Sequence, residues 1–337
     1  MARRGLGLAA MRAIVLDSHG GPEVLVLREV PDPLPGPEEV VVEIASTAVN
    51  RADVLQRMGR YPGPPMAHEV PGLELAGRVI GRGERASRWE LGDAVMGIVA
   101  GGAYAERIAV HERQLMAVPA SLPLADAGSV PEVWITAWDA LVAQGGLTPG
   151  RTALVHAGAS GVGTAAIQLC RAIGARVAVT CSTAKVEACA ALGADLVVDH
   201  TSGDFVAATR ELTDGRGVDV VLDVVGGDYL ARNLDALAVG GSIVQVGVMA
   251  DVMATFPLGL LLPKRARIIG TVLRARPLEE KIATTAEFAR QVLPLFDQGR
   301  CAPVIDRRFP LERVGDAHRH MEANANVGKI VLDVADR

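Results

Sequence analysis

The chain has few aromatic residues and no surplus of basic ones, and it lacks a long apolar run. Aromatic residues make up 3% of its 337 residues, which disfavours a surface that stacks nucleobases or sugars. Lys and Arg number 34 against 39 Asp and Glu, so the net charge is −5 and we expect no nucleic acid partner. The longest apolar runs, such as residues 258–262, fall far below the ~20 residues that cross a bilayer, so we expect no membrane partner.

Cysteine is also scarce, and the four cysteines form neither a CxxC pair nor a Cys/His cluster with zinc-ligand spacing. This usage predicts a reducing, cytoplasmic location. Residues 1–10 begin with a basic and then an apolar stretch, but Arg12 interrupts it and no cleavage site follows. We therefore expect residues 1–10 to be a disordered extension.

The length favours two domains, and 50% hydrophobic with 22% charged residues is a globular composition. Residues 11–130 carry short β-rich runs broken by Gly and Pro, which predicts a small antiparallel barrel or sandwich. The expected strands are 13–16, 39–48, 75–81, 94–99 and 104–110, with one helix at 51–58.

From residue 131 the pattern changes to apolar strands that alternate with Ala-rich helices, which is typical of a doubly wound parallel sheet. The expected strands are 152–156, 176–180, 196–199, 218–224, 242–246 and 267–272. The last segment reads as a strand, a helix at 314–324 and a strand at 329–334. We assign 305–337 to the first domain, with 11–130, and 131–304 to the nucleotide-binding domain.

The strongest local motif follows the strand at 152–156, where a turn of small residues leads into a helix. Such a turn lets the backbone approach a pyrophosphate, which the helix N-terminus attracts. The pattern departs from G-x-G-x-x-G, because we expect Ala157, Ser160 and Gly163 to occupy the three glycine places. Tight packing alone is the other interpretation of the turn.

The next strand ends without the carboxylate that an NAD-specific site places near the ribose hydroxyls. Ser182 and Lys185 instead offer a hydroxyl and a cation, which suit a 2′-phosphate. We therefore predict NADPH as the cofactor. A helix N-cap followed by a solvated lysine is the alternative.

Five stretches together carry a family resemblance: residues 48–53 (AVNRAD), 72–77 (GLELAG), 131–137 (PEVWITA), 156–165 (HAGASGVGTA) and 321–332 (MEANANVGKIVL). The chain resembles the medium-chain dehydrogenase/reductase superfamily, and within it the zinc-free NADPH quinone oxidoreductases, over nearly all of residues 11–334. The resemblance implies a GroES-like β-domain plus a doubly wound Rossmann domain. It also implies a metal-free site, because zinc dehydrogenases of the superfamily place Cys at Asn50, His at Leu73 and a third ligand at Glu132.

Transfer of a hydride to a carbonyl compound needs a hydrogen-bond donor for the oxygen that becomes negative. The resemblance implies that Asn50 and Tyr61 lie on the substrate side and Thr136 beside the nicotinamide. From the sequence alone, Tyr61 reads equally well as a loop tyrosine and Asn50 as a turn residue before a helix.

The ends of successive strands predict the other cofactor contacts. The expected residues are Ser160, Gly161, Val162, Ser182, Lys185, His200, Val225, Gly247, Val248, Leu273 and Arg274, and the resemblance adds Asn326 and Lys329. We predict an oxidoreductase that passes electrons from NADPH to a quinone or an α,β-unsaturated carbonyl compound. An enoyl-thioester reductase and a non-catalytic NADPH-binding sensor are the alternatives. We also expect a homodimer that pairs through the strand at 267–272.

Overall fold

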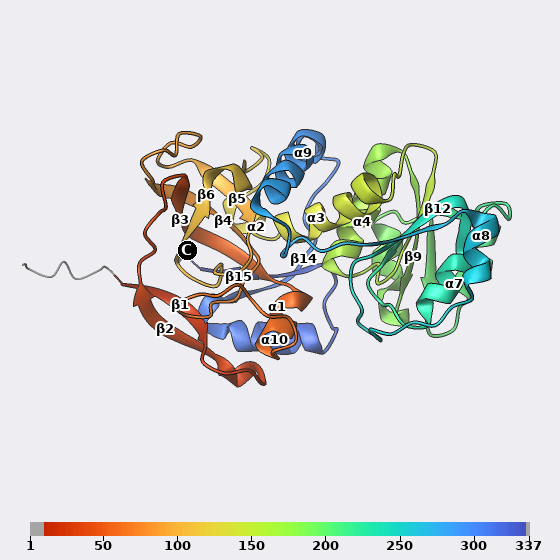
Figure 1. Cartoon of the computed structure of the whole chain (residues 1–337), viewed down its shortest axis with the longest axis horizontal. Coiled ribbons are helices and arrows are strands. Elements are labelled where there is room, and N and C mark those ends of the chain that lie inside the picture. Colours follow the sequence, from red (N-terminus) through yellow and green to blue (C-terminus); the bar gives the residue numbers. More distant parts are fainter. Residues whose placement is uncertain (1–9, 335–337) are drawn as a thin grey trace, which may run out of the picture. The chain divides into compact units, whose positions relative to one another are not determined.

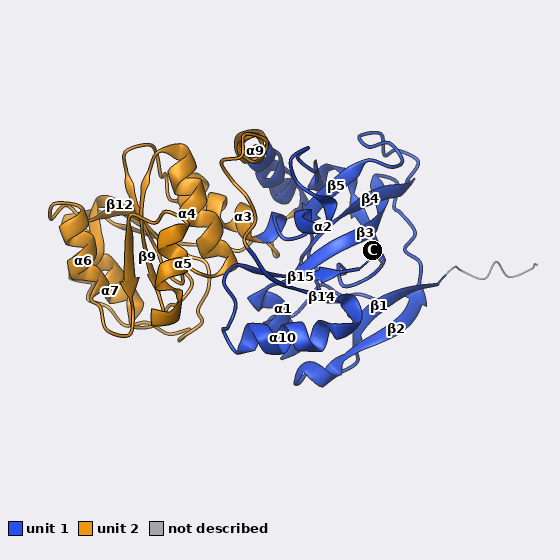
Figure 2. Cartoon of the chain, turned by 180° about the vertical axis from the view of Figure 1, so that it is seen from behind, with its two compact units in different colours: residues 1–132, 278–289, 305–337 blue, residues 133–277, 290–304 orange. Residues whose placement is uncertain are grey.

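The structure is a computed structural model, and it describes residues 10–334. The predicted extension, residues 1–10, lies outside the described residues except for Ala10, which begins a strand. The chain divides into two compact units (Figure 2). Unit 1 comprises the residues up to 132, residues 278–289 and the residues from 305 onward, and unit 2 comprises residues 133–277 and 290–304. The predicted domains differ from these units at residues 131–132 and 278–289, which the prediction assigns to the nucleotide-binding domain and the structure to unit 1.

Unit 1 is built on a seven-stranded sheet in the order β14-β15-β3-β4-β5-β7, with β6 paired to β3 (Figure 1). The strands are β3 (Glu39–Val49), β4 (Glu74–Arg82), β5 (Ala94–Ile98), β6 (Arg107–His111), β7 (Leu115–Ala117), β14 (Ile305–Pro310) and β15 (Lys329–Asp333). A separate hairpin consists of β1 (Ala10–Leu16) and β2 (Leu25–Pro31). Because β15 pairs antiparallel with β3, residues 329–333 join this sheet although they lie far from β3 in the sequence.

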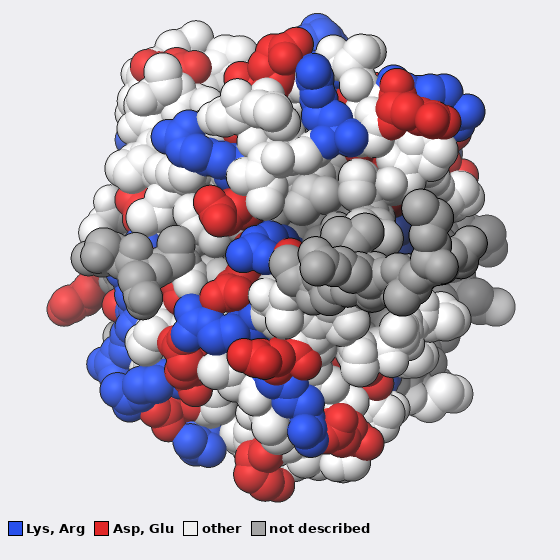
Figure 3. Space-filling view, turned by 90° about the vertical axis from the view of Figure 1, so that its left-hand side faces the viewer, with Lys and Arg blue, Asp and Glu red and all other residues white. Residues whose placement is uncertain are grey.

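Short helices accompany the strands of unit 1, among them α1 (Arg51–Arg57), α2 (Leu124–Ala127) and α10 (Val314–Glu322). Aliphatic side chains from the strands and from α10 form one core, which includes Ile44, Leu75 and Ala317. On the face shown in Figure 3, basic and acidic side chains alternate, and neither sign forms a continuous area.

Unit 2 is a six-stranded parallel sheet in the order β10-β9-β8-β11-β12-β13. The strands are β8 (Thr152–Val155), β9 (Arg176–Cys181), β10 (Leu196–Asp199), β11 (Val218–Asp223), β12 (Leu237–Gln245) and β13 (Arg267–Gly270). The central strands β8 and β11 are buried along their whole length, as strands covered on both faces are. The chain order reverses between β8 and β11, which is where doubly wound sheets bind their ligands. The predicted fold class is confirmed.

Helices connect the strands of unit 2: α3 (Pro131–Trp138) precedes the sheet, and α4 (Gly161–Ile173), α5 (Val186–Ala191), α6 (Phe205–Leu212), α7 (Tyr229–Ala236) and α8 (Leu261–Lys264) follow. The last residues of α3 continue into a π-helical turn, Asp139–Gln144. Helix α9 (Leu278–Asp297) was not predicted from the sequence. In the part of the chain that the structure describes, no helix is both long enough and apolar enough to pass through a bilayer.

Candidate functional site

The turn from β8 into α4 is closely packed against backbone. A Cβ atom added to Gly163 would lie 2.4 Å from the carbonyl oxygen of Ala157, and one added to Gly158 would lie 2.6 Å from Cβ of Val179. Ser160 caps the helix, because its Oγ accepts a hydrogen bond from the backbone N–H of Gly163 over 3.0 Å. The prediction that Ala157 takes the first fingerprint place is wrong: the G-x-G-x-x-G spacing falls on Gly158, Ser160 and Gly163, so serine is the one departure.

This turn offers a cradle for a pyrophosphate. The first N–H groups of a helix have no intrahelical carbonyl partner, and the side chain of Ser160 accepts that of Gly163. The N–H groups of Gly161 and Val162 begin α4, a helix of 13 residues whose dipole favours an anion at this end. The residues present thus fit a dinucleotide.

The ends of β9 and β10 bring Ser182, Lys185 and His200 to one edge of the sheet. The N–H of His200 donates to the carbonyl of Cys181, and the N–H of Lys185 donates to the carbonyl of Ser182, both over 2.9 Å. Ser182, Lys185 and His200 therefore stand at neighbouring strand ends, and their contact with a 2′-phosphate stays a prediction.

A carboxylate that the sequence analysis did not consider, Asp199, ends β10 in the same region. It accepts hydrogen bonds from Thr183 Oγ1 over 2.5 Å and from the N–H of Thr201 over 2.9 Å. These bonds, with that from Thr183 first, lower the pKa of Asp199, so it is ionised at neutral pH. Its two oxygens each have a threonine partner.

Buried Asp223, at the end of β11, organises the loops that carry Val225, Gly247 and Val248. Its Oδ1 accepts the N–H of Val225 over 2.6 Å, and its backbone carbonyl accepts the N–H of Val246 over 2.7 Å. In the sequence, Asp223 is predicted only as part of the strand at 218–224. Its position as the last residue of an apolar run was the available signal.

The other oxygen of Asp223 extends this network inward. Asn233 Nδ2 donates to Asp223 Oδ2 over 2.9 Å, and Asn233 Oδ1 lies 2.7 Å from His156 Nε2. The second ring nitrogen of His156 lies 2.9 Å from Thr180 Oγ1. Burial lowers the pKa of His156, so the imidazole is neutral and acts as a structural link between β8, β9 and α7.

The segment after β13 carries Leu273 and Arg274, and a buried ion pair holds it. Arg276 Nη2 lies 2.6 Å from Asp139 Oδ2, and Thr271 Oγ1 donates to the same oxygen over 2.9 Å. Asp139 stands three residues after buried Thr136, so the ion pair also anchors the helical turn of that residue. Neither Asp139 nor Arg276 was predicted as a site residue.

In unit 1, Asn50 lies between β3 and α1. Its backbone N–H donates to Asp53 Oδ2 over 2.8 Å, and Asp53 also accepts the N–H of Gly72 and the hydroxyl of Tyr104, each over 3.2 Å. Asp53 is completely buried, and burial raises its pKa to about 6. The interpretation of Asn50 as a residue that begins a helix is thus correct, and it does not exclude a role on the substrate side.

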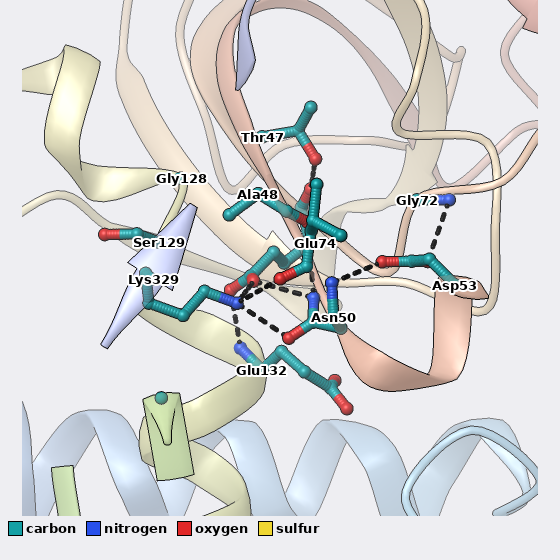
Figure 4. A network of polar contacts seen from close by, with 12 residues as sticks. Thr47, Ala48, Asn50, Asp53, Gly72, Glu74, Gly128, Ser129, Glu132 and Lys329 are labelled. Atoms are coloured by element: carbon teal, nitrogen blue, oxygen red, sulfur yellow. Dashed lines mark hydrogen bonds and ion pairs between the residues drawn. The ribbon is translucent and has the colours of Figure 1, made fainter. Parts of the chain in front are cut away.

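The side chain of Asn50 belongs to a buried network (Figure 4). Its Nδ2 donates to Glu74 Oε1 over 2.9 Å and to the carbonyl of Ala48 over 3.3 Å. Its Oδ1 accepts a hydrogen bond from Lys329 Nζ over 2.7 Å. Glu74 Oε2 accepts the backbone N–H of Glu132 over 2.9 Å.

The remaining predicted residues have these positions. Tyr61 is partly exposed in the loop after α1. Asn326 is buried, and its Nδ2 donates to the carbonyl of Gly328 over 2.8 Å. Thr136 lies in unit 2 and Asn50 in unit 1, so their proximity stays a prediction.

The residues at the metal positions of zinc dehydrogenases do not fit zinc. Leu73 is buried and has no donor atom, and the amide of Asn50 is bonded within the protein. Among residues 10–334, no group of three His, Cys, Asp or Glu side chains is arranged to hold a metal ion.

Two family models match the chain: an alcohol dehydrogenase GroES-like domain at residues 36–120 and a zinc-binding dehydrogenase at residues 192–332. The rat (Rattus norvegicus) synaptic vesicle membrane protein VAT-1 homolog is 32% identical, over 96% of this chain and 84% of its own length. The quinone oxidoreductase of Lama guanicoe is 30% identical, over 97% of this chain and 98% of its own length. One of the phenolphthiocerol/phthiocerol polyketide synthase proteins of Mycobacterium tuberculosis is 32% identical over 98% of this chain, which matches 15% of that protein.

Solved structures are also similar to this chain over nearly its whole length. A mycobacterial quinone oxidoreductase superposes with a TM-score of 0.86 at 30% identity, over 96% of this chain and all of its own. A cyclopropanase of the curacin A biosynthetic pathway superposes with a TM-score of 0.86 at 26% identity, over 96% of this chain and 99% of its own. The chain therefore belongs to the medium-chain dehydrogenase/reductase superfamily, and within it to the quinone oxidoreductase-like branch.

Proposed function

We propose that the protein is a zinc-independent oxidoreductase that passes electrons from NADPH to a quinone or a related α,β-unsaturated carbonyl compound. One observation supports the proposal: the turn before α4 has a geometry that fits a dinucleotide, while hydrogen bonds to Glu74 and Lys329 engage the side chain of Asn50, which stands where zinc dehydrogenases have a cysteine. A dehydrogenase site without a Lewis acid suits acceptors that are already electron-poor.

The chain's own residues would bind the cofactor at three places. The N–H groups of Gly161 and Val162 would hold the pyrophosphate, and Ser182, Lys185 and His200 would hold the 2′-phosphate. The segment that Arg276 and Asp139 fix would line the cofactor through Leu273 and Arg274. When bound, NADPH supplies a hydride, and with one proton from solvent it converts a quinone into a hydroquinone.

The substrate side needs a hydrogen-bond donor for the reduced oxygen. Both amide hydrogens of Asn50 already donate to protein acceptors, Glu74 and the carbonyl of Ala48. Asn50 is therefore a poor donor here, and we assign the donation to the phenol of Tyr61 or to a water molecule.

Enoyl-thioester reduction is the second candidate. The match to a polyketide synthase protein over 98% of this chain supports it, because a segment of that synthase resembles this whole chain. The two reactions share a hydride donor and differ in the acceptor. A thioester substrate also requires a channel for a phosphopantetheine arm.

The rate of NADPH oxidation by the purified protein tests both candidates. An ortho-quinone, crotonyl-CoA and no acceptor would be compared, each with NADPH and with NADH. We expect quinone-dependent turnover that favours NADPH and survives a chelator. Faster turnover of crotonyl-CoA would establish the thioester reductase, NADPH binding without turnover would indicate a sensor, and a stoichiometric zinc ion would refute zinc independence.

We also propose that the protein is a homodimer. Strand β13 ends the sheet of unit 2, and Ile268 and Val272 at this edge are 40% and 45% exposed. An apolar edge strand pairs readily with its twin about a two-fold axis. Light scattering would give the mass, and Ile268→Glu should yield monomers if the strand forms the interface.

A further inference from the structure

A chain of buried hydrogen bonds crosses unit 2 from the end of β11 to the end of β9. It joins the side chains of Asp223, Asn233, His156 and Thr180, each at most 3% exposed. Its three links measure 2.9, 2.7 and 2.9 Å, so each is a hydrogen bond of normal length.

The carboxylate at one end determines the direction of every bond. A carboxylate only accepts, so Asn233 Nδ2 donates to Asp223 and the amide oxygen of Asn233 faces His156. An amide oxygen also only accepts, so the ring hydrogen of His156 is on Nε2. Burial lowers the pKa of His156 and keeps the ring neutral, so Nδ1 accepts the hydroxyl hydrogen of Thr180. The other neutral tautomer would set a lone pair of Nε2 against the oxygen of Asn233.

Both ends of the chain reach loops that are candidates for cofactor binding. Asp223 Oδ1 accepts the backbone N–H groups of Val225 over 2.6 Å and of Gly226 over 3.1 Å, at the start of the loop after β11. At the other end, the backbone carbonyl of Thr180 accepts the N–H of Gly158 over 2.8 Å, in the turn that leads into α4. The chain therefore connects the two loops through the interior of unit 2.

His156 directly precedes a strained residue of that turn. Ala157 has a φ of +57°, a left-handed conformation that is costly for a residue with a Cβ atom and persists where its surroundings hold it. The backbone N–H of His156 donates to the carbonyl of Leu222 over 3.1 Å. Its ring also makes edge-to-face contacts with Phe205 and Tyr229, with centroids 5.0 and 4.9 Å away. The ring thus anchors the residue from which the turn starts.

We propose that His156, with its ring hydrogen on Nε2, is a positioning residue that holds the turn before α4 and the loop after β11 in the arrangement that receives a dinucleotide. The ring is buried and both of its nitrogens are bonded, so it acts through these loops rather than by touching the cofactor. Because the pyrophosphate is common to NADPH and NADH, His156 should affect the affinity for both. This inference rests on the proposed function, in which the turn binds a dinucleotide.

The tautomer of His156 gives the first test. Side-chain ¹H–¹⁵N NMR spectra distinguish a protonated from an unprotonated ring nitrogen, and the signals of His156 are those that His156→Gln lacks. We expect the hydrogen on Nε2. A hydrogen on Nδ1 would overturn the proposal.

Titration of the cofactor-free protein with NADPH and with NADH gives the second test. His156→Leu, His156→Gln, Asn233→Leu and the double variant His156→Leu/Asn233→Leu would be compared with the wild type, and urea unfolding would give the stability of each. Asn233→Leu breaks the chain with His156 in place, so it also serves if His156→Leu does not fold. His318→Leu is the matched control, because His318 is another buried histidine, bonded to Tyr104 in unit 1.

We expect His156→Leu to raise Kd for both cofactors about tenfold, and His156→Gln, which keeps a donor toward Asn233, to raise it less than about threefold. The double variant should stay within about twofold of the weaker-binding single variant, because the chain acts as one unit. The control should lose stability and keep both Kd values. A loss of stability in His156→Leu at unchanged Kd would reduce His156 to a structural link and overturn the proposal. So would additive losses, or a rise in Kd for NADPH alone.

Failure of the proposed function would be recognised separately, because the titrations need no turnover. A wild type that binds NADPH and reduces no quinone would refute the proposed reaction, and the variants would still decide the role of His156. A wild type that binds neither cofactor would overturn both.

Discussion

Replacement of Gly163 by alanine would test the nucleotide cradle directly. The new Cβ would lie 2.4 Å from the carbonyl oxygen of Ala157 and 2.5 Å from the carbonyl carbon and oxygen of Gly158. All three atoms belong to the backbone of the β8–α4 turn, so no flexible side chain can move aside. The clash therefore has to separate the start of α4 from the turn.

The expected loss of stability follows from two opposing effects. Overpacking costs about 1–3 kcal/mol, and alanine in place of glycine in a helix regains at most about 1 kcal/mol. Because all three close contacts are to backbone, the upper part of that cost, about 2–3 kcal/mol, applies, and we expect Gly163→Ala to lower the free energy of unfolding by about 1–2 kcal/mol. Because the N–H groups of Gly161 and Val162 would move with the helix, we also expect Kd for NADPH to rise at least about tenfold, or about 1.4 kcal/mol.

Urea unfolding of the cofactor-free protein and titration with NADPH would measure the two effects. Gly259→Ala is the control, because a Cβ at Gly259 would meet no atom within 4 Å and the backbone there is not left-handed. We expect this variant to match the wild type in both assays. If Gly163→Ala behaved like Gly259→Ala, the close packing of the turn and its role in cofactor binding would both be refuted.

Three further outcomes are expected. Lys185→Ala should weaken NADPH binding by about 1–3 kcal/mol and leave NADH binding nearly unchanged, and equal losses in a titration would contradict the 2′-phosphate assignment. Tyr61→Phe should lower kcat without changing Kd for NADPH, whereas an unchanged kcat would remove Tyr61 from the mechanism. Burial raises the pKa of Asp53 from its ordinary 3.8 to about 6 in the folded protein. As pH rises, the carboxyl group of Asp53 therefore ionises in the unfolded chain at a lower pH than in the folded protein. The wild type should therefore lose about 3 kcal/mol of unfolding free energy relative to Asp53→Asn between pH 4 and about 7, and a pH-independent difference would contradict the raised pKa.

The parallel sheet could be predicted well because its strands are short apolar runs. The strand predicted at 218–224 is Val218–Asp223, and the one predicted at 196–199 is Leu196–Asp199. Elements with weaker patterns were missed. Most side chains of β2 (Leu25–Pro31) are exposed, so it shows no apolar run, and α9 (Leu278–Asp297) contains Pro294, which normally ends a helix.

The residue types of the site could be predicted, but their contacts could not. Motif positions identified Asn50 and Lys329, yet the partner that engages Lys329 is Glu74, 255 residues away in sequence. Asp139 and Arg276, 137 residues apart, gave no local signal at all. Such pairs depend on the register of strands and the path of loops, which follow from the packing of the whole unit.

These ion pairs have a consequence for how an acidic chain of net charge −5 binds an anionic cofactor. Asp139 neutralises Arg276 and Glu74 neutralises Lys329, so neither cation contributes a net charge to its surroundings. The attraction for phosphates then depends on the N-terminus of α4 and on the cations among the predicted cofactor contacts, Lys185 and Arg274. Because exposed charges are screened by salt, NADPH affinity should fall more steeply with ionic strength than NADH affinity, and Lys185→Ala should remove most of that difference.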